Sequence, residues 1–222
     1  MRTIVILLLT MSSIIGQAQV FSNDMAAINN SYSKLKSNFT ITSTTKSEDG
    51  KSSTQTIQVR MNGLSSYYAA DESTELLVTQ DVKVMLNREF EVLMVDSARA
   101  KVQAESIPTS LFDTLMAVYE TIEYKNLSNN TGQYTLVPKY GQYERVVMTY
   151  DKRSFKIQKI VITAFDVNTQ QNYSLTTQYA YSAFTKIPVS TNYVQKNSNG
   201  ILTASKQWQS YEFLNYYNLQ TR

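Results

Sequence analysis

Alternation of apolar and polar residues, interrupted by frequent turn signals, constrains the fold of this chain more than any other feature. From Phe39 onward apolar side chains recur at every second position, as in residues 57–61, where Ile57, Val59 and Met61 alternate with polar neighbours. A period of two places successive side chains on opposite faces of a β-strand. The chain is therefore predicted to be mainly β.

Turn signals such as Asp49-Gly50 and Asn62-Gly63 divide these stretches into about a dozen strands. The links are too short for parallel crossovers, so sequential strands are expected to pair antiparallel, as a meander. The apolar stretch 90–95 is predicted to be a central strand. The expected strands are near 39–43, 57–61, 64–69, 76–79, 82–86, 90–95, 122–127, 134–137, 145–150, 156–165 and 173–181, with a final hairpin over 191–217.

A helix is predicted near the N-terminus, over residues 23–36. Apolar side chains recur there every three or four positions, which places them on one face of a helix. Asn23 or Asp24 can cap the first turn. The predicted apolar face consists of Met25, Ile28, Tyr32 and Leu35.

A second helix is predicted over residues 107–119, where Pro108 suits a first turn and Leu111, Leu115 and Val118 form an apolar stripe. The expected fold class is mainly β (α+β). A strongly curved antiparallel sheet or incomplete β-barrel, covered by two or three helices, would bury the most apolar surface.

The N-terminus has the three parts of a secretory signal peptide. Arg2 supplies a positive charge, residues 4–15 are apolar, and residues 16–18 form a small-x-small cleavage site. The apolar stretch is shorter than the roughly 20 residues that span a bilayer, so no stable membrane anchor is expected. We therefore expect cleavage after residue 18 and a soluble protein in the periplasm, with secretion or association with the cell surface as the alternative.

Residues 19–222 are long enough for one well-buried core, so a single domain is expected, with an additional C-terminal hairpin over 189–222. The chain contains no cysteine and no histidine. Catalytic centres of the Ser-His-Asp or Cys-His type and Cys/His zinc sites are thereby excluded. The net charge of +3 is not concentrated in long runs, which argues against nucleic acid as a partner. No enzymatic activity, cofactor or metal is expected.

Paired carboxylates are the one common type of hydrolytic site that remains possible. An exported hydrolase is therefore kept as a third hypothesis, behind the two non-enzymatic hypotheses given below. Each candidate pair falls in a turn, on a polar strand face or at a helix end, where solvated carboxylates are the rule. The pairs are Asp71 with Glu72, Glu89 with Glu91, and Glu120 with Glu123.

The 16 tyrosines and the single tryptophan, Trp208, are the unusual part of the composition. They can fill the core of a sheet, because aromatic side chains pack well across a pleated surface. They can also form a concave apolar surface for a ligand. Methionines would suit the second role, because unbranched thioethers re-pack around irregular guests, although they fill gaps in any core.

The order of elements resembles the periplasmic lipoprotein carriers of the LolA type, over about residues 23–188. The resemblance lies in an opening helix that runs into a hairpin, a strand-turn-strand unit with Asp and Lys in its turn, and a mid-chain helix followed by strands. The segments that carry it are 35–39, 59–60, 71–73, 76–84, 134–138 and 157–164.

The resemblance implies a soluble carrier that shelters the acyl chains of a lipoprotein in the periplasm. It also implies an inner-membrane releasing complex or an outer-membrane acceptor as partners, and a functional arginine that by position falls on Arg60. The alternation of Arg60 with Val59 and Met61 predicts equally well that Arg60 is a charged residue on the solvent-facing side of its strand. We expect a monomer.

Two hypotheses for function follow. The first is a carrier or chaperone that binds a lipid, a lipoprotein acyl chain or another apolar ligand between the sheet and the two helices. The second is a non-enzymatic interaction module of an envelope or secretion assembly, with Trp208, Tyr211, Phe213 and Tyr216 as exposed anchors. The predicted ligand-binding residues are Met61, Leu86, Phe90, Val92, Met94, Leu111, Leu115, Met148 and Ile160.

Overall fold

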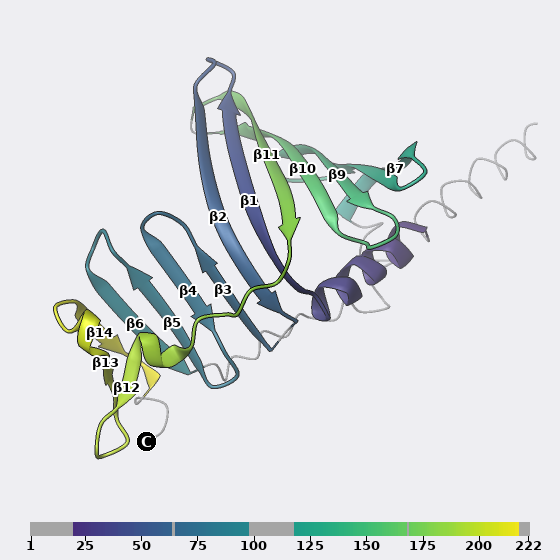
Figure 1. Cartoon of the computed structure of the whole chain (residues 1–222). Helices are drawn as coiled ribbons and strands as arrows, with labels where there is room; N and C mark the ends of the chain where they lie inside the picture. Colours follow the sequence, from purple (N-terminus) through teal and green to yellow (C-terminus); the bar gives the residue numbers. More distant parts are fainter. Residues whose placement is uncertain (1–19, 64, 98–117, 168, 218–222) are drawn as a thin grey trace, which may run out of the picture. The chain divides into compact units, whose positions relative to one another are not determined.

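The computed structural model describes residues 20–63, 65–97, 118–167 and 169–217 (Figure 1). Residues 20–33 form the N-terminal helix, and Ser190–Asn192 (η1) and Lys206–Trp208 (η2) are short 3-10 helices. The strands are β1 (Lys36–Ser47), β2 (Ser52–Asn62), β3 (Ser66–Ala70), β4 (Thr74–Val78), β5 (Val82–Asn87), β6 (Val92–Ser97), β7 (Tyr119–Ser128), β8 (Thr131–Pro138), β9 (Tyr143–Asp151), β10 (Ile157–Asp166), β11 (Gln171–Ser182), β12 (Val194–Lys196), β13 (Leu202–Ala204) and β14 (Glu212–Asn215).

One sheet of 12 strands has the order β14-β6-β5-β4-β3-β2-β1-β11-β10-β9-β8-β7, and β12 and β13 form a separate pair. Strands β1 to β6 and β7 to β11 are two sequential runs, which meet where β1 lies beside β11. The first and last strands of that order are β14 and β7, so the sheet is open. The predicted fold class, mainly β on one large unclosed sheet, is confirmed.

The chain divides into two compact units, and the long strands β1, β2 and β11 contribute residues to both. The described residues of unit 1 are 20–32, 42–55, 118–167 and 169–179. Those of unit 2 are 33–41, 56–63, 65–97 and 180–217.

In unit 1 the N-terminal helix packs on the strands through its apolar face. Ile28 is buried against side chains of β8 and β9, with Met25 and Tyr32 beside it, as the sequence predicts. The predicted helix start at residue 23 is wrong, because residues 20–22 are already helical. Phe21 explains the longer helix, since its ring meets Tyr134 edge-on at 4.8 Å and is 3% exposed.

Asp24 consequently lies inside the helix instead of capping it, and so does Asn23. The Asp24 carboxylate accepts hydrogen bonds from the hydroxyls of Tyr134, at 2.7 Å, and Tyr150. Burial, together with the hydrogen bond to Asp24, raises the pKa of both tyrosines well above the ordinary value. Leu35, the fourth residue of the predicted apolar face, is buried but follows the end of the helix.

The Tyr150 ring lies over Gly132 of the neighbouring strand, which explains why a glycine occupies that position of β8. A Cβ atom at Gly132 would come within 2.7 Å of the Tyr150 ring. The two residues are directly paired in the β8–β9 register. This arrangement lets Tyr150 stay flat against the sheet, with its hydroxyl directed to Asp24.

In unit 2 the C-terminal segment, residues 187–217, packs on strands β3 to β6. Tyr193, Val194 and Leu202 join the most deeply buried side chains of β4, β5 and β6 in one core cluster. The predicted C-terminal hairpin over 191–217 is only partly right. The hairpin is limited to β12 and β13, and β14 instead pairs parallel with β6 (Figure 1).

Because β14 occupies the edge, β6 is the second strand of the sheet rather than the predicted central one. It also starts later than predicted, at Val92, after a turn over residues 88–91. The predicted helix over 107–119 lies outside the described residues except for Val118 and Tyr119, and Tyr119 begins β7. Within the described ranges, no helix has the length and apolar character needed to cross a membrane.

Candidate ligand-binding face

The register of β2 to β6 assigns every side chain of unit 2 to one of two sheet faces. Leu77 is paired with Val84, and Val84 with Val95, on the face that the C-terminal segment covers. We call this the core face. Its members on β4 to β6 are among the most buried side chains of the described chain: Leu77, Val84, Leu86, Leu93 and Val95 are at most 1% exposed.

The opposite face is also apolar, and we call it the methionine face. Its central row runs from Ala69 through Leu76, Met85 and Met94 to Leu214, each residue paired with the next on the neighbouring strand. Val59 of β2 begins that row and is buried. The other members retain part of their surface in contact with solvent: Met61, Tyr67, Ala69, Leu76, Val78, Met85, Val92, Met94 and Leu214.

Two methionines lie directly opposite each other at the centre of this face. Met85 of β5 is paired with Met94 of β6, so their side chains leave the sheet side by side. Unbranched thioether side chains have three rotatable bonds and adapt to irregular apolar shapes. A partly exposed surface of this kind can therefore accommodate flexible hydrocarbon.

The methionine face ends in a polar border. In the row next to the central one, Met61, Tyr67 and Val78 are followed by Lys83 and Asp96, which are paired across β5 and β6. Burial raises the pKa of Tyr67. In the row on the other side, Thr74, Asn87, Val92 and Glu212 are paired in the same way. An amphipathic ligand would find apolar contacts in the central row and polar or charged groups along both margins.

The core face is fastened to the C-terminal segment by one buried carboxylate. Glu75 is 8% exposed and accepts hydrogen bonds from the Tyr193 hydroxyl and from the guanidinium of Arg88. Burial, reinforced by Glu75, raises the pKa of Tyr193 well above its ordinary value. The Tyr193 ring also stacks on Trp208, with 6.4 Å between ring centroids.

The structure divides the predicted ligand-binding residues of unit 2 between different surroundings. Met61, Val92 and Met94 share the methionine face, whereas Leu86 is 0% exposed in the core face. Phe90 is 71% exposed in the turn before β6, where its backbone N–H donates to the Asn87 side chain at 3.0 Å.

The remaining predicted residues lie in unit 1 or outside the described chain. Met148 is 7% exposed beneath the N-terminal helix, and Ile160, its partner on β10, packs on the same cluster. Both therefore contribute to the core of unit 1. Leu111 and Leu115 lie outside the described residues.

Arg60, the arginine singled out by resemblance, lies on the core-face side of β2, paired with Tyr68. Its Nη1 donates to the carbonyl of Lys186 at 3.0 Å, and its guanidinium lies 5.4 Å from the centre of the Tyr68 ring. These contacts hold the start of the C-terminal segment. A functional role for Arg60 stays a prediction.

The aromatic anchors of the interaction-module hypothesis are mostly part of the fold. Trp208 donates its indole N–H to the Asn192 carbonyl at 3.1 Å and meets Tyr211 edge-on at 5.1 Å. Both pack on the unit 2 core, as does Phe213. Tyr216, at 43% exposure, is the one member of the four that is exposed.

The candidate carboxylate pairs are mostly solvated. Glu72, Glu89, Glu91, Glu120 and Glu123 are exposed. Asp71 instead serves the turn between β3 and β4, where its carboxylate accepts the backbone N–H groups of residues 73 and 74 at 2.9 and 2.7 Å. Among the described residues, no cluster of acidic side chains is arranged to hold a metal ion.

Several members of the methionine face were missed from the sequence. Their signal is visible in the strand 74–78, where Leu76 and Val78 alternate with the buried Glu75 and Leu77. A strand that is apolar on both faces has a second surface to cover. The missed residues are Val59, Tyr67, Ala69, Leu76, Val78 and Leu214, while Met85 fits a ligand surface by its residue type but is absent from the predicted set.

Comparison with known proteins gives distant likenesses to solved structures. An uncharacterized conserved protein from Thermus thermophilus is 7% identical over 88% of this chain and 99% of its own, with a TM-score of 0.46. A chain of the MucA/MucB complex of Pseudomonas aeruginosa is 14% identical over 76% of this chain and 58% of its own, with a TM-score of 0.39. A LolA superfamily protein from Nitrosomonas europaea is 8% identical over 72% of this chain and 93% of its own, with a TM-score of 0.32.

No protein-family model matches the chain, and no curated protein matches it. A protein of the LolA type, the family that the sequence resembles, is thus among these distant likenesses of fold.

Proposed function

We propose that this protein is a periplasmic carrier or chaperone that binds an apolar ligand, such as a lipid or the acyl chain of a lipoprotein, on the methionine face of unit 2. The observation that carries the proposal is that β3 to β6 carry apolar side chains on both faces. The C-terminal segment covers one of them. The other keeps Met61, Met85 and Met94 partly exposed to solvent.

Partly exposed apolar side chains gathered on one sheet face form a candidate binding surface. On the unit 1 strands, the face opposite the helix is instead rich in polar side chains. One of its rows consists of Lys125, Gln133, Thr149, Lys159 and Gln178. The contrast argues that the apolar character of the methionine face has a purpose beyond folding.

Burial of hydrocarbon supplies enough free energy for such a task without any catalytic group. Each buried methylene contributes about 0.8 kcal/mol, so a long acyl chain offers roughly 10 kcal/mol of transfer free energy. Met85 and Met94 can follow the shape of the chain, while Lys83 at the margin can meet an anionic headgroup. The signal-like N-terminus supports a periplasmic location. A membrane complex that releases or accepts the ligand would then be a partner.

Binding of a dansyl-labelled fatty acid to the purified protein tests this proposal. We expect saturable binding with a rise and blue shift of dansyl fluorescence. The change Met94→Lys should weaken binding by about tenfold or more, because it places a charge at the centre of the face. The matched control is Thr135→Lys, which places the same side chain on the polar face of unit 1.

Two results would contradict the proposal. One is the absence of saturable binding to wild-type protein whose circular dichroism shows it to be folded. The other is equal weakening by Met94→Lys and Thr135→Lys, which would mean that the methionine face is not the site.

A further inference from the structure

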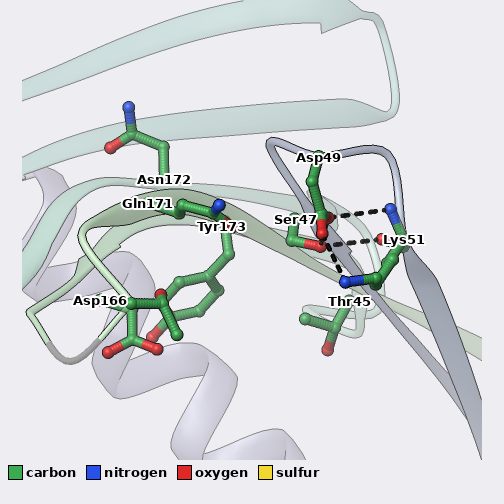
Figure 2. Close-up of a pocket in the computed structure, with 9 residues that line it drawn as sticks. Thr45, Ser47, Asp49, Lys51, Asp166, Gln171, Asn172 and Tyr173 are labelled. Carbon is green, nitrogen blue, oxygen red and sulfur yellow. Dashed lines mark hydrogen bonds and ion pairs between the residues drawn. The ribbon is translucent and has the colours of Figure 1, made fainter.

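A polar groove at the strand tips of unit 1 is a second concave feature, separate from the methionine face. It lies between the β1–β2 turn and the turn from β10 to β11, and its volume is about 400 Å³. Figure 2 shows Ser47, Asp49 and Lys51 on one side of it, and Asp166, Gln171 and Tyr173 on the other. The lining residues are Thr45, Ser47, Asp49, Lys51, Asp166, Thr169, Gln171, Asn172 and Tyr173.

Hydrogen bonds hold the β1–β2 wall of the groove in place. The Asp49 carboxylate accepts from the Ser47 hydroxyl at 2.6 Å and pairs with the Lys51 ammonium at 2.8 Å. These contacts lower the pKa of Asp49 well below its ordinary value. The hydrogen bonds of this carboxylate define the shape of the turn.

The two walls are also tied to each other. The backbone N–H of Glu48 donates to the Asn172 carbonyl at 3.0 Å, and the Asn172 N–H donates to the Glu48 carboxylate at 3.1 Å. Because both turns are joined by this pair of hydrogen bonds, the groove exists before a ligand arrives. A preformed site avoids the free-energy cost of ordering loops on binding.

The groove combines an aromatic surface with planar polar groups. Tyr173 is partly buried and contributes its ring, while Gln171 contributes an amide and Asp166 a carboxylate. Thr45 and Thr169 add hydroxyl groups. Such a site favours a ligand that has one apolar face and a rim of groups that both donate and accept hydrogen bonds.

The formal charge of the groove lining argues against anionic ligands such as phosphate and sulfate. The lining contains one cation, Lys51, and two carboxylates, Asp49 and Asp166, so its formal charge is negative. Lys51 is already paired with Asp49. Phosphate and sulfate groups need clustered donors and positive charge, which this groove does not supply.

We propose that this groove binds a small neutral saccharide, with the C–H face of a sugar ring on Tyr173 and its hydroxyls directed to Asp166 and Gln171. The C–H face of a pyranose is apolar, and its equatorial hydroxyls bind carboxylates and amides side-on. A volume of about 400 Å³ lies within the range of small-molecule sites and suits a saccharide of one or two rings. The inference is independent of the methionine face and of its ligand.

Titration of the isotope-labelled protein with glucose, galactose, N-acetylglucosamine and maltose, followed by NMR, tests the proposal. At least one sugar should shift the amide signals of residues 45–51 and 169–173 in a saturable way. Saturation transfer should be strongest to the C–H protons of one ring face. The change Tyr173→Leu should weaken binding about tenfold, because it keeps an apolar side chain but removes the aromatic face.

The matched control is Tyr140→Leu, which removes an 83% exposed tyrosine elsewhere in unit 1 and should leave the affinity unchanged. If Tyr173→Leu does not give a folded spectrum, Gln171→Ala replaces it, with weaker binding again expected. The proposal is overturned if none of the four sugars shifts these amides at millimolar concentration. It is also overturned if the folded variant binds as tightly as wild type.

Discussion

Units 1 and 2 both cover one apolar face of their strands, but they use different elements and leave different faces behind. In unit 1 the cover is the N-terminal helix, and in unit 2 it is the C-terminal segment. In each unit a carboxylate that accepts hydrogen bonds from tyrosine hydroxyls stabilises the contact between the covering segment and the strands. Asp24 serves Tyr134 and Tyr150, and Glu75 serves Tyr193.

The faces opposite these covers differ, within the described residues, in a way that stability alone does not explain. Unit 1 follows the usual pattern of an antiparallel sheet, with one apolar face and one face rich in polar residues. Unit 2 departs from it, because Leu76, Met85 and Met94 oppose a face that is already packed. Both cores are thus closed in the same way, by a segment that a carboxylate holds through tyrosine hydroxyls. The difference between the units is the methionine face, which we attribute to function.

Alkaline pH should produce the largest loss of stability, because it acts on the tyrosines of both units. The pKa values of Tyr134, Tyr150 and Tyr193 are raised in the folded protein above the ordinary value of 10.0. The folded state then holds protons that the unfolded state loses, so stability is complete below about pH 10 and falls as the pH rises above it. Urea unfolding at a series of pH values, with tyrosinate absorbance, measures this.

The same titration can contradict the account. If all tyrosines ionise with an ordinary pKa while circular dichroism still shows a folded sheet, the three hydroxyls are not buried against carboxylates. The change Tyr193→Phe should make the decline with pH less steep, since one of the three raised groups is removed.

Replacing Asp24 with alanine should lower the free energy of unfolding by about 3 kcal/mol. The hydroxyls of Tyr134 and Tyr150 lose their acceptor, and water cannot easily replace it because these side chains are 0% and 1% exposed. Urea unfolding followed by circular dichroism measures the loss. Asp24→Asn keeps an acceptor oxygen and should cost less, and equal stability of Asp24→Ala and wild type would refute the role of this carboxylate.

Glu75→Ala should cost less than Asp24→Ala, about 2 kcal/mol, by the same measurement. The Tyr193 hydroxyl loses its acceptor, but the Arg88 side chain is 41% exposed and can return to water. Arg88→Ala is therefore the matched control, with an expected loss below about 1 kcal/mol. A larger loss for Arg88→Ala than for Glu75→Ala would mean that the ion pair, and not the tyrosine bond, fastens the C-terminal segment.

A pair of substitutions on neighbouring residues of β6 distinguishes the two faces of unit 2. Met94→Ala should lower the free energy of unfolding by about 1 kcal/mol, because Met94 is only partly buried. Leu93→Ala, one position away on the core face, should cost about 3 kcal/mol, because Leu93 is 0% exposed. Equal losses in thermal and urea unfolding would show that the methionine face is packed as tightly as the core.

The sequence predicts local structure well where one pattern dominates. The period of two locates the strands from β1 to β11, and the helical period of Met25, Ile28 and Tyr32 identifies the face that packs in unit 1. The start of that helix was missed because Phe21 acts through a contact with Tyr134, which is distant in sequence. Helix boundaries set by tertiary packing leave no local signal.

The candidate site was predicted only in part, because face assignment depends on register. Leu86 and Met94 belong to adjacent strands, yet a register of β5 and β6 that pairs Leu86 with Leu93 puts them on opposite faces. A shift of one residue exchanges the two faces of a strand. The path of the C-terminal segment was equally hidden, since the parallel pairing of β14 with β6 joins parts of the chain that are distant in sequence.

Photo-crosslinking with a fatty acid that carries a diazirine on its acyl chain tests the central claim most directly. After irradiation of the purified protein, mass spectrometry of its peptides locates the attached label. The account predicts labels on β2 to β6 at methionine-face positions, led by Met85 and Met94, that an excess of unlabelled fatty acid suppresses. Labels confined to unit 1, or spread over the surface without competition, would contradict it.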